Sequence, residues 1–347
     1  MVLMKRVLVN SKENPYYIYI NDNFEYFIKL LKEYKLNKVV IVFDYNAYKF
    51  HGKQFIKLLE ENEILQEKYI LKSNEKNKNL NTVYDIYDFL YRAKVDRNAV
   101  LIAFGGGIIG DIVGFVASSY KRGIRFIQVP TTLLACIDSS IGGKVAVNFK
   151  DIKNLIGAFY NPLFVYENVT LLNTLEKREY NCGMVEIIKH ALLADAEFFE
   201  QIESGNCKSL EEMIRKSVEI KAEIVEIDEK ENGLRVILNL GHTVGHAIES
   251  VSKFRVSHGE AVALGILYSL KVSCELNKMS KKNAKRIEKL FKEIGVLPKN
   301  LKDLSARKIK KCIEQDKKMK DGILQYVILD DIGKYEILHM DKMKYFS

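Results

Sequence analysis

The stretch AVLIAFGGGIIGDIVGFVASSY (residues 99–120) carries the pattern that predicts the fold. It opens with a compact apolar run typical of a buried strand and continues, after its glycines, with an apolar pattern typical of a helix. Gly105, Gly107 and Gly110 match G-x-G-x-x-G. In a turn from strand to helix, such glycines let backbone amides approach a pyrophosphate at the helix N-terminus. The stretch predicts a nucleotide-binding turn, and a glycine-rich turn without a ligand is the alternative.

Strand and helix patterns alternate on both sides of this turn. KVVIVFD (residues 38–44) and IRFIQVP (residues 124–130) are apolar runs of strand length, and LNTVYDIYDFLYRAK (residues 80–94) has helical spacing. Such alternation is typical of a mostly parallel sheet wrapped by helices. KVVIVFD ends in Asp44, followed by Asn46. A carboxylate at the end of a strand suits a ribose diol, although an Asp there is also a common helix cap.

The pattern changes after LFVYENV (residues 163–169). From Lys177 to about Lys318, apolar residues recur at three- and four-residue spacing, which predicts helices. A short β pair, ILQYVIL and KYEIL, is expected to close the chain. We therefore expect a nucleotide-binding α/β domain over residues 1–168 and a mainly α-helical domain over residues 169–347. In two-domain enzymes the ligand site commonly lies in a cleft between the domains.

Composition indicates a globular protein whose basic excess is compatible with an anionic substrate. The net charge is +9, from 54 basic and 45 acidic residues. Most lysines alternate with glutamates, as on solvated helix faces, and part of the excess suits a phosphorylated substrate. No nucleic-acid-binding motif accompanies the charge, so we expect no nucleic-acid partner. The N-terminal apolar run is too short for a signal peptide, and no stretch approaches the roughly 20 apolar residues of a membrane span. Five cysteines without close spacing are expected to be free thiols in a reducing cytoplasm.

Three of the six histidines fall within seventeen residues, at His242, His246 and His258. The first two lie at i and i+4, on one face of a helix, and neutral imidazoles suit Zn²⁺. The glutamate that follows the first histidine in zinc proteases is absent, because Thr243 stands there. Glu186, in CGMVEIIKHALL, offers a carboxylate ligand in an otherwise apolar helix. The cluster predicts a zinc site, although any one of these residues taken alone is more often a core histidine or a surface charge.

A second polar stretch combines glycines with lysines. VPTTLLACIDSSIGGKVAVNFKDIKNLIGAF (residues 129–159) includes Gly142, Gly143 and Lys144. Backbone and ammonium can approach a phosphate oxygen together at such a turn. It is not a P-loop, because Asp138 and Val145 stand where that motif needs a glycine and a hydroxyl residue. A turn with an incidental lysine is the alternative.

At this point the sequence resembles the 3-dehydroquinate synthase family of sugar-phosphate cyclases. The matching segments run in order from about Asp44 to Ile337. Two departures are small: LNLGH replaces the usual LNFGH, and KSNE replaces the usual PxGE before Glu75. The matching segments are GGGIIGDIVGFVASSYKRGIRFIQVPTTLLACIDSSIGGKVAVN, KNLIGAFYNP, EIIKHALL, DEKENGLRVILNLGHTVGHAIE, SHGEAV and DKKMKDGILQYVILDDIGKYEI.

The resemblance implies a site for each ligand. Zn²⁺ or Co²⁺ would be held by Glu186, His242 and His258. NAD would contact Asp44, Asn46, Glu75, Lys78, Gly106, Gly107, Asp111, Thr131, Thr132, Lys153, Thr174 and Glu179. The substrate would meet Asp138, Lys144, Asn154, Lys189, Lys221, Arg235, Asn239 and His246, with Lys317 or Lys318 on the phosphate and Arg122 reaching across a homodimer interface.

The implied activity is a phosphorus–oxygen lyase of the shikimate pathway, which supplies aromatic amino acid biosynthesis. The family's substrate is 3-deoxy-D-arabino-heptulosonate 7-phosphate, and its products are 3-dehydroquinate and phosphate. Two enzymatic rivals remain open, and a third interpretation, a non-enzymatic interaction protein on the same scaffold, is disfavoured by the complete set of implied zinc and substrate residues. Sister cyclases that make deoxy-inosose or valiolone products share the NAD and zinc apparatus, and a glycerol-dehydrogenase-like oxidoreductase would release NADH. Arg235 with Asn239 favours a substrate that carries a carboxylate.

Overall fold

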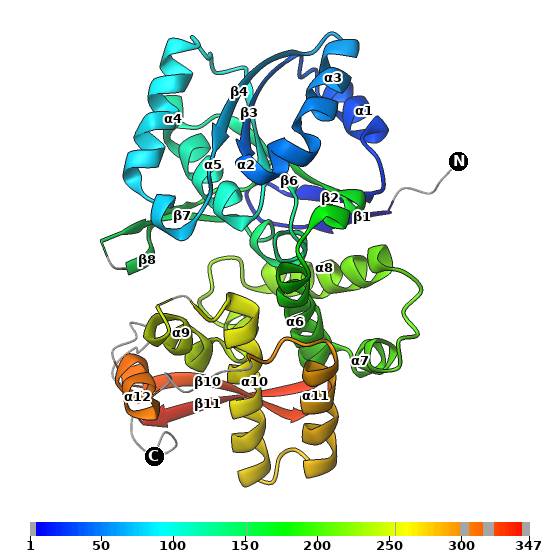
Figure 1. Cartoon of the computed structure of the whole chain (residues 1–347), viewed down its shortest axis with the longest axis vertical. Helices are drawn as coiled ribbons and strands as arrows, with labels where there is room; N and C mark the ends of the chain where they lie inside the picture. Colours follow the sequence, from blue (N-terminus) through cyan, green and yellow to red (C-terminus); the bar gives the residue numbers. More distant parts are fainter. Residues whose placement is uncertain (1–4, 151, 254, 299–304, 315–322, 342–347) are drawn as a thin grey trace. The chain divides into compact units, whose positions relative to one another are not determined.

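The chain forms two compact units (Figure 1). The computed structural model describes residues 5–150, 152–253, 255–298, 305–314 and 323–341. The first unit comprises Met1–Glu176 and Leu210–Glu229, and the second comprises Lys177–Ser209 and Lys230–Ser347. By contacts, one helix of the predicted helical half therefore belongs to the first unit. The predicted boundary between residues 168 and 169 stays a prediction.

The first unit is built on a seven-stranded sheet in the order β1-β2-β9-β6-β5-β3-β4. Every neighbouring pair is parallel except β1 with β2. The mostly parallel sheet predicted from the alternating pattern is therefore confirmed. The strands are β1 Lys5–Val9, β2 Tyr16–Asn21, β3 Lys38–Asp44, β4 Leu65–Leu71, β5 Val100–Gly105, β6 Arg125–Pro130 and β9 Phe164–Asn168.

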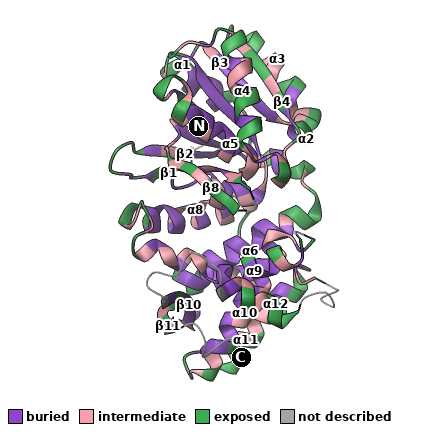
Figure 2. Cartoon of the chain, turned by 90° about the vertical axis from the view of Figure 1, so that its left-hand side faces the viewer, coloured by how far each residue is buried: buried purple, intermediate pink, exposed green. Residues whose placement is uncertain are grey.

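Helices cover both faces of this sheet, which explains the apolar runs that predicted its central strands. All six residues of β5 are buried, and Figure 2 shows the sheet as a buried layer. Strands buried on both faces have continuous rather than alternating hydrophobic sequences. One apolar cluster packs the sheet against α1 and α3, and another packs it against α4 and α5. These helices are α1 Glu25–Glu33, α3 Lys53–Glu61, α4 Leu80–Arg92 and α5 Gly107–Ser119, and the short α2 Tyr45–Ala47 follows β3.

Two further elements complete the first unit. Strands β7 (Lys144–Phe149) and β8 (Ile152–Phe159) form an antiparallel pair where the sequence predicted only a glycine–lysine turn. The pair packs on α5 at Gly114, where a Cβ would lie 2.3 Å from Val145 Cγ1. Helix α8 (Leu210–Ile227) packs against β1 and against the π-helical turn η4 (Ala135–Ser139).

The second unit is mainly helical, as predicted, and ends in the predicted β pair. Helices α9 and α10 pack together, and α10 also packs against α6 and β10. Strands β10 and β11 pair antiparallel. The elements are α6 Lys177–Ala194, α7 Ala196–Glu203, η6 Leu234–Asn239, α9 His242–Val251, α10 His258–Glu275, α11 Lys281–Glu293, α12 Ala306–Glu314, β10 Ile323–Asp331 and β11 Lys334–Asp341.

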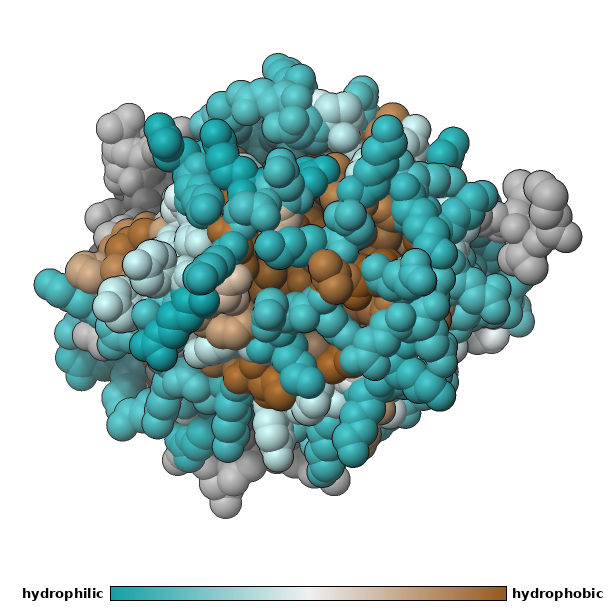
Figure 3. All heavy atoms as spheres, turned by 90° about the horizontal axis from the view of Figure 1, so that it is seen from above, coloured by the Kyte–Doolittle hydropathy of each residue, from teal (hydrophilic) through white to brown (hydrophobic). Residues whose placement is uncertain are grey.

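The helix surfaces are charged, as the lysine–glutamate spacing predicts. Ion pairs one helical turn apart join Lys29 to Glu33 on α1 and Lys57 to Glu61 on α3. Figure 3, seen from above the view of Figure 1, shows a largely hydrophilic face with hydrophobic side chains gathered between the polar ones. Among the residues the structure describes, no helix is both long and apolar enough to cross a membrane.

One carboxyl group is buried in the sheet without visible compensation. Glu167, on β9, has no exposed surface, and neither of its oxygens has a hydrogen-bond partner within the described ranges. Burial raises the pKa of this carboxyl well above its ordinary value. The folded state therefore holds a proton on Glu167 that the unfolded chain releases near pH 4.5.

Replacing Glu167 by Gln is expected to make the protein more resistant to unfolding at neutral and alkaline pH. The pKa of Glu167 is higher in the folded protein than in the unfolded chain. The contribution of Glu167 to the free energy of unfolding is therefore complete below the unfolded pKa and is lost as pH rises toward the folded pKa. Within that window the wild type loses up to about 1.4 kcal/mol per pH unit from this group, a loss that Gln lacks. Urea unfolding at several pH values between about 5 and 8 measures the difference.

The matched control is Glu33→Gln, which removes a carboxylate from the half-exposed surface of α1 and isolates the effect of net charge. Equal pH dependence in the Glu167→Gln variant and the wild type would contradict a proton held at Glu167.

Candidate functional site

The glycine turn lies at the carboxyl edge of the parallel sheet. Strand β5 ends at Gly105 and α5 begins at Gly107, so that Gly106 is the helix N-cap and contributes no side-chain hydrogen bond. The amides of the first helical turn thus receive no acceptor from the cap, an arrangement that suits a pyrophosphate. Thr131 and Thr132 follow the neighbouring strand β6, and the Thr131 amide donates to Gly105 O at 3.0 Å. Most of the predicted NAD contacts therefore share one edge of the sheet.

Packing also leaves little room for a Cβ at Gly107 and Gly110, with or without a ligand. A Cβ on Gly107 would lie 2.6 Å from Ser139 Oγ, and one on Gly110 would lie 2.6 Å from Gln128 Oε1. The motif is thus explained in part by the close approach of α5 to its neighbours.

Asp44 acts as a helix cap, the structural alternative noted in the sequence. Its Oδ1 accepts from the amides of Asn46 at 2.8 Å and Ala47 at 3.2 Å. Its Oδ2 accepts from the hydroxyl of Ser73. These bonds fix the carboxylate at the end of β3, where a ribose contact remains a prediction. The side chain of Asn46 is exposed.

Several predicted NAD and substrate residues form one polar network in the first unit. The Lys78 ammonium, 5% exposed, pairs with Asp111 and donates to Asn154 Oδ1 at 2.5 Å. Burial raises the pKa of the Asp111 carboxyl, and the Lys78 ion pair opposes that shift. Glu75 Oε1 lies 3.9 Å from the Lys153 ammonium. The structure thus brings together Glu75, Lys78, Asp111, Lys153 and Asn154.

Asn148 also belongs to this network, although the sequence pattern did not predict it as a site residue. Its Nδ2 donates to Glu75 Oε1 at 2.8 Å, and its Oδ1 accepts from the Asn154 amide at 2.9 Å. Asn148 lies in β7 of the unpredicted hairpin, so the signal that would have found it is the alternation in KVAVNF.

A second polar group lies where α8 meets η4. The buried Lys221 pairs with the Asp138 carboxylate and donates to Asp138 O at 2.6 Å. The nearby glycines Gly142 and Gly143 have φ of +95° and +66°, which explains why glycine precedes the exposed Lys144. Among the remaining predicted residues, Arg122 is exposed with φ of +67°.

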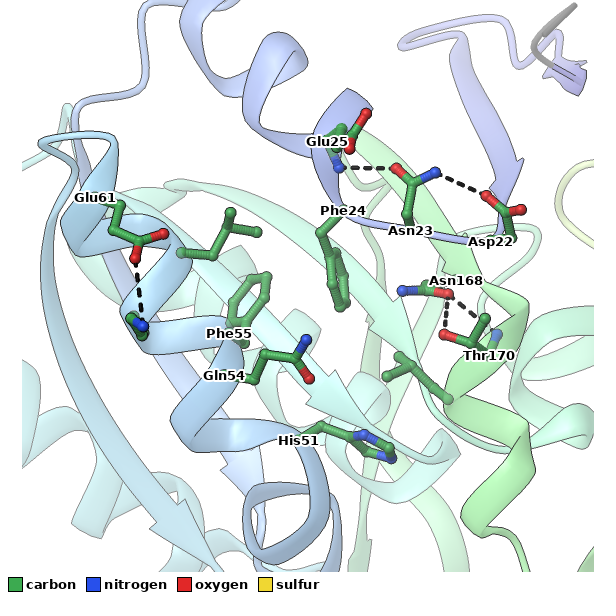
Figure 4. Close-up of a pocket in the computed structure, with 13 residues that line it drawn as sticks. Asp22, Asn23, Phe24, Glu25, His51, Gln54, Phe55, Glu61, Asn168 and Thr170 are labelled. Atoms are coloured by element: carbon green, nitrogen blue, oxygen red, sulfur yellow. Dashed lines mark hydrogen bonds and ion pairs between the residues drawn. The ribbon is translucent and has the colours of Figure 1, made fainter.

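A pocket of about 430 Å³ lies beside this edge of the sheet (Figure 4). His51, which lines it, has its Nε2 2.8 Å from Thr174 Oγ1, a predicted NAD contact. Thr174 itself and Glu179, at the start of α6, are exposed. No residue predicted to bind NAD, metal or substrate lines this pocket. Its lining residues are Asp22, Asn23, Phe24, Glu25, His51, Gln54, Phe55, Lys57, Leu58, Glu61, Asn168, Thr170 and Leu171.

The second unit contains the predicted metal-ligand cluster. Glu186 Oε1, on α6, lies 3.9 Å from His242 Nε2 and 3.8 Å from His258 Nε2. The buried Lys189 pairs with the other oxygen, Oε2, one helical turn along. The three predicted ligands therefore come together from α6, α9 and α10.

The local backbone places both histidines at the first position of a helix. Gly241, with φ of +78°, turns the chain into α9. It packs closely on Gly265 of α10, where an added Cβ would lie 1.9 Å from Gly241 O. Ser257 and Glu260 form a capping box at the start of α10. Arg178, on α6, donates two hydrogen bonds to the Glu260 carboxylate, from Nε at 2.9 Å and from Nη2 at 2.6 Å. Burial raises the pKa of Glu260, but the hydrogen bonds from Arg178 and Ser257 together outweigh it, so that the pKa lies below its ordinary value.

The cluster fits a divalent metal ion. Glu186 is fully buried, yet Oε1 receives no hydrogen bond from any residue that the structure describes. Two imidazole nitrogens and a carboxylate are the donor set of a catalytic zinc site, where ligand atoms lie about 2 Å from the ion and a fourth position is open. A second group, His246, Glu249 and His258, also offers ligand atoms within 4.8 Å of one another.

The other predicted substrate residues of the second unit are placed as follows. Arg235, in η6, is 3% exposed. Asn239, at the end of η6, donates to Glu231 Oε1 at 3.2 Å. His246, one turn after His242 on α9, is exposed. The predicted phosphate contacts Lys317 and Lys318 lie outside the described residues.

A parallel α/β unit with a glycine turn and a helical unit with a carboxylate–imidazole cluster define a class of protein that combines nucleotide-binding and metal-binding parts in one chain. Residues 68–182 match the family model described as 3-dehydroquinate synthase N-terminal, and residues 183–319 match that described as 3-dehydroquinate synthase C-terminal. The chain belongs to the 3-dehydroquinate synthase family.

Individual relatives agree. A 3-dehydroquinate synthase of Acetivibrio thermocellus is 41% identical over 333 residues, which cover 94% of this chain and 92% of the relative. A crystal structure of 2-deoxy-scyllo-inosose synthase complexed with carbaglucose-6-phosphate, NAD⁺ and Co²⁺ has a TM-score of 0.84 at 25% identity, covering 98% of this chain and 97% of that one. A 2-epi-5-epi-valiolone synthase from Streptomyces hygroscopicus with NAD⁺ and Zn²⁺ bound has a TM-score of 0.82 at 25% identity, covering 90% and 89%.

Proposed function

We propose that the chain converts 3-deoxy-D-arabino-heptulosonate 7-phosphate to 3-dehydroquinate and phosphate, as a lyase of the shikimate pathway that uses NAD and Zn²⁺ or Co²⁺. The observation that carries the proposal is the Glu186–His242–His258 cluster in a chain that is about 40% identical to 3-dehydroquinate synthases over nearly its whole length. We place the enzyme in the cytoplasm as a homodimer, with Arg122 donated across the interface.

The metal site has a defined task in this reaction. When bound, the ion lowers the pKa of the alcohol to be oxidised and stabilises the developing negative charge. Glu186 would supply the carboxylate ligand, while Lys189, paired with Oε2, balances its charge and orients it. His242 and His258 supply the two imidazoles.

The NAD contacts lie mainly in the first unit. When bound, NAD would supply a reversible hydride acceptor for carbon 5 of the substrate, with no net oxidation over the cycle. The amides at Gly106 and Gly107, at the start of α5, would hold the pyrophosphate, and Asp44, at the end of β3, would hold the ribose. The remaining contacts are assigned to Asn46, Glu75, Lys78, Asp111, Thr131, Thr132, Lys153, Thr174 and Glu179.

Substrate recognition is assigned by charge. Arg235, with Lys221, binds the carboxylate, because a guanidinium offers two parallel hydrogen bonds. Lys144, Asn154, Asn239 and His246 hold the phosphate, with Lys317 or Lys318. The phosphate accepts the proton at carbon 6 as it leaves, which is why few protein bases are needed. Asp138 and Lys189 complete the set, with Asp138 oriented by Lys221.

A sister cyclase activity is the second candidate, supported by the structural match to the inosose and valiolone synthases. Their 25% identity is well below the 41% identity of the dehydroquinate synthase relative, and Arg235 gives a reason for an acidic substrate. A glycerol-dehydrogenase-like activity fits less well, since that class usually binds its metal with an Asp in place of Glu186.

Turnover is expected to continue with NAD far below the substrate concentration. The reaction returns its hydride, so phosphate and dehydroquinate accumulate in equal amounts over many cycles while NADH absorbance stays flat. Purified protein with the heptulosonate phosphate, a divalent metal and catalytic NAD provides the test. NADH formed in step with product would support the oxidoreductase instead, and turnover of a hexose phosphate in place of the acidic substrate would support a sister cyclase.

A further inference from the structure

A second carboxylate, that of Glu249, contacts the ring nitrogen of His258 that faces away from Glu186. His258 Nδ1 lies 3.4 Å from Glu249 Oε2, while His258 Nε2 faces Glu186 Oε1 at 3.8 Å. Glu249 lies on α9, and its side chain is only 7% exposed. The imidazole is thus placed between two buried carboxylates, one at each ring nitrogen.

His242 shows the same arrangement with a different partner. Its Nδ1 lies 3.2 Å from the carbonyl oxygen of Leu240, and its Nε2 faces Glu186 Oε1 at 3.9 Å. An acceptor at Nδ1 fixes the proton there and leaves the Nε2 lone pair for a metal. Both predicted ligands are therefore set to the same tautomer, His242 by the backbone and His258 by a side chain.

We propose that Glu249 is a positioning residue for the metal site, which accepts a hydrogen bond from His258 Nδ1–H and orients Nε2 without binding the metal itself. The inference rests on the metal site of the proposed function. The negative charge of a carboxylate beside the outer nitrogen strengthens the imidazole as a ligand, because it stabilises the positive charge that the ring shares with the ion. A metal in turn makes Nδ1–H a stronger donor to Glu249.

Glu249 is also a member of the second candidate group, with His246 and His258. Two observations favour Glu186 as the ligand. Glu186 Oε1 is fully buried and receives no hydrogen bond from the described part of the chain, so it lacks the compensation that a metal would give. His246, which the second group requires, is exposed on α9.

The test is the affinity of the metal-free protein for Co²⁺, measured by chelator competition and by the visible absorption of the bound ion. Glu249→Ala is expected to weaken Co²⁺ binding about 10–100-fold at an unchanged stoichiometry. Glu249→Gln is expected to recover part of the loss, because its amide oxygen accepts the same hydrogen bond but carries no negative charge. His246→Ala, the matched variant on the same helix face, is expected to bind Co²⁺ within about threefold of the wild type.

Three results would overturn the inference: wild-type affinity in Glu249→Ala, no recovery in Glu249→Gln, or equal weakening by His246→Ala and Glu249→Ala. The last would place the ion in the second group. If Glu249→Ala does not fold, Glu249→Met fills the space without accepting a hydrogen bond and replaces it. Binding is measured without substrate or NAD, so a protein that binds Co²⁺ as expected but makes no dehydroquinate would refute the proposed function alone.

Discussion

Chelation of the metal is expected to abolish turnover of the heptulosonate phosphate, and added Zn²⁺ or Co²⁺ is expected to restore it. We expect this result because Glu186 Oε1, His242 Nε2 and His258 Nε2 converge on one point. Among the described residues, none donates a hydrogen bond to the buried Glu186 Oε1. An ion there is worth several kcal/mol of charge stabilisation in the oxidation step, so its removal costs at least about a thousandfold in rate.

Two substitutions separate ligand from substrate contact. His258→Ala is expected to lose bound metal and activity together. His246→Ala is expected to keep its metal and lose rate, because His246 is assigned to the phosphate. Metal content per chain and steady-state rate, measured on the same preparations, give both quantities. A metal-free His246→Ala protein would show that ligand and substrate contact have been exchanged.

Arg235→Leu is expected to lower kcat/KM for the heptulosonate phosphate by about thirtyfold to several thousandfold. Arg235 is 3% exposed, so a substrate carboxylate bound to it lies away from water. Truncation of one partner leaves that carboxylate unpaired at a cost of roughly 2–5 kcal/mol, which transition-state arithmetic converts to this range. Arg235→Lys is expected to recover only part of the loss, because an ammonium lacks the planar fork.

Metal content and NAD affinity serve as controls for Arg235→Leu, since neither assigned site uses this side chain. Both are expected to match the wild type. A variant within about twofold of wild-type kcat/KM would remove Arg235 from substrate recognition. It would also remove the main physical reason for preferring the dehydroquinate product over those of the sister cyclases.

The sequence predicted best those elements that are buried on every side. Strands β3, β5 and β6 are central, and their apolar runs are continuous. Strand β4, LQEKYIL, was missed because it is an edge strand whose residues are largely exposed. The β7–β8 hairpin was missed because its alternation lies within a segment whose glycines and lysines first indicated a turn.

For the site, spacing predicted neighbours but not their roles. The i, i+4 spacing correctly placed His242 and His246 on one helix, but only the structure shows that the first is buried beside Glu186 and the second is exposed. The partners of Asp44 and Asn148 depend on side chains distant in sequence, such as Ser73 and Glu75. The approach of Glu249 to His258 depends on how α9 and α10 pack together, which the residue types of the two helices do not indicate.

The return of the chain to its first unit at α8 has a consequence for synthesis and dissection of the protein. The polypeptide passes between units after Glu176, after Ser209 and after Glu229, so neither unit is a contiguous segment. On the ribosome, the first unit cannot complete its native contacts until residue 229 has been made. Lys221, for example, pairs with Asp138 but follows it in the chain only after residues 177–209 of the second unit. A fragment cut at residue 176 would expose the apolar surface that α8 covers. An expression plasmid for the isolated nucleotide-binding half would therefore need residues 210–229 rejoined by a linker.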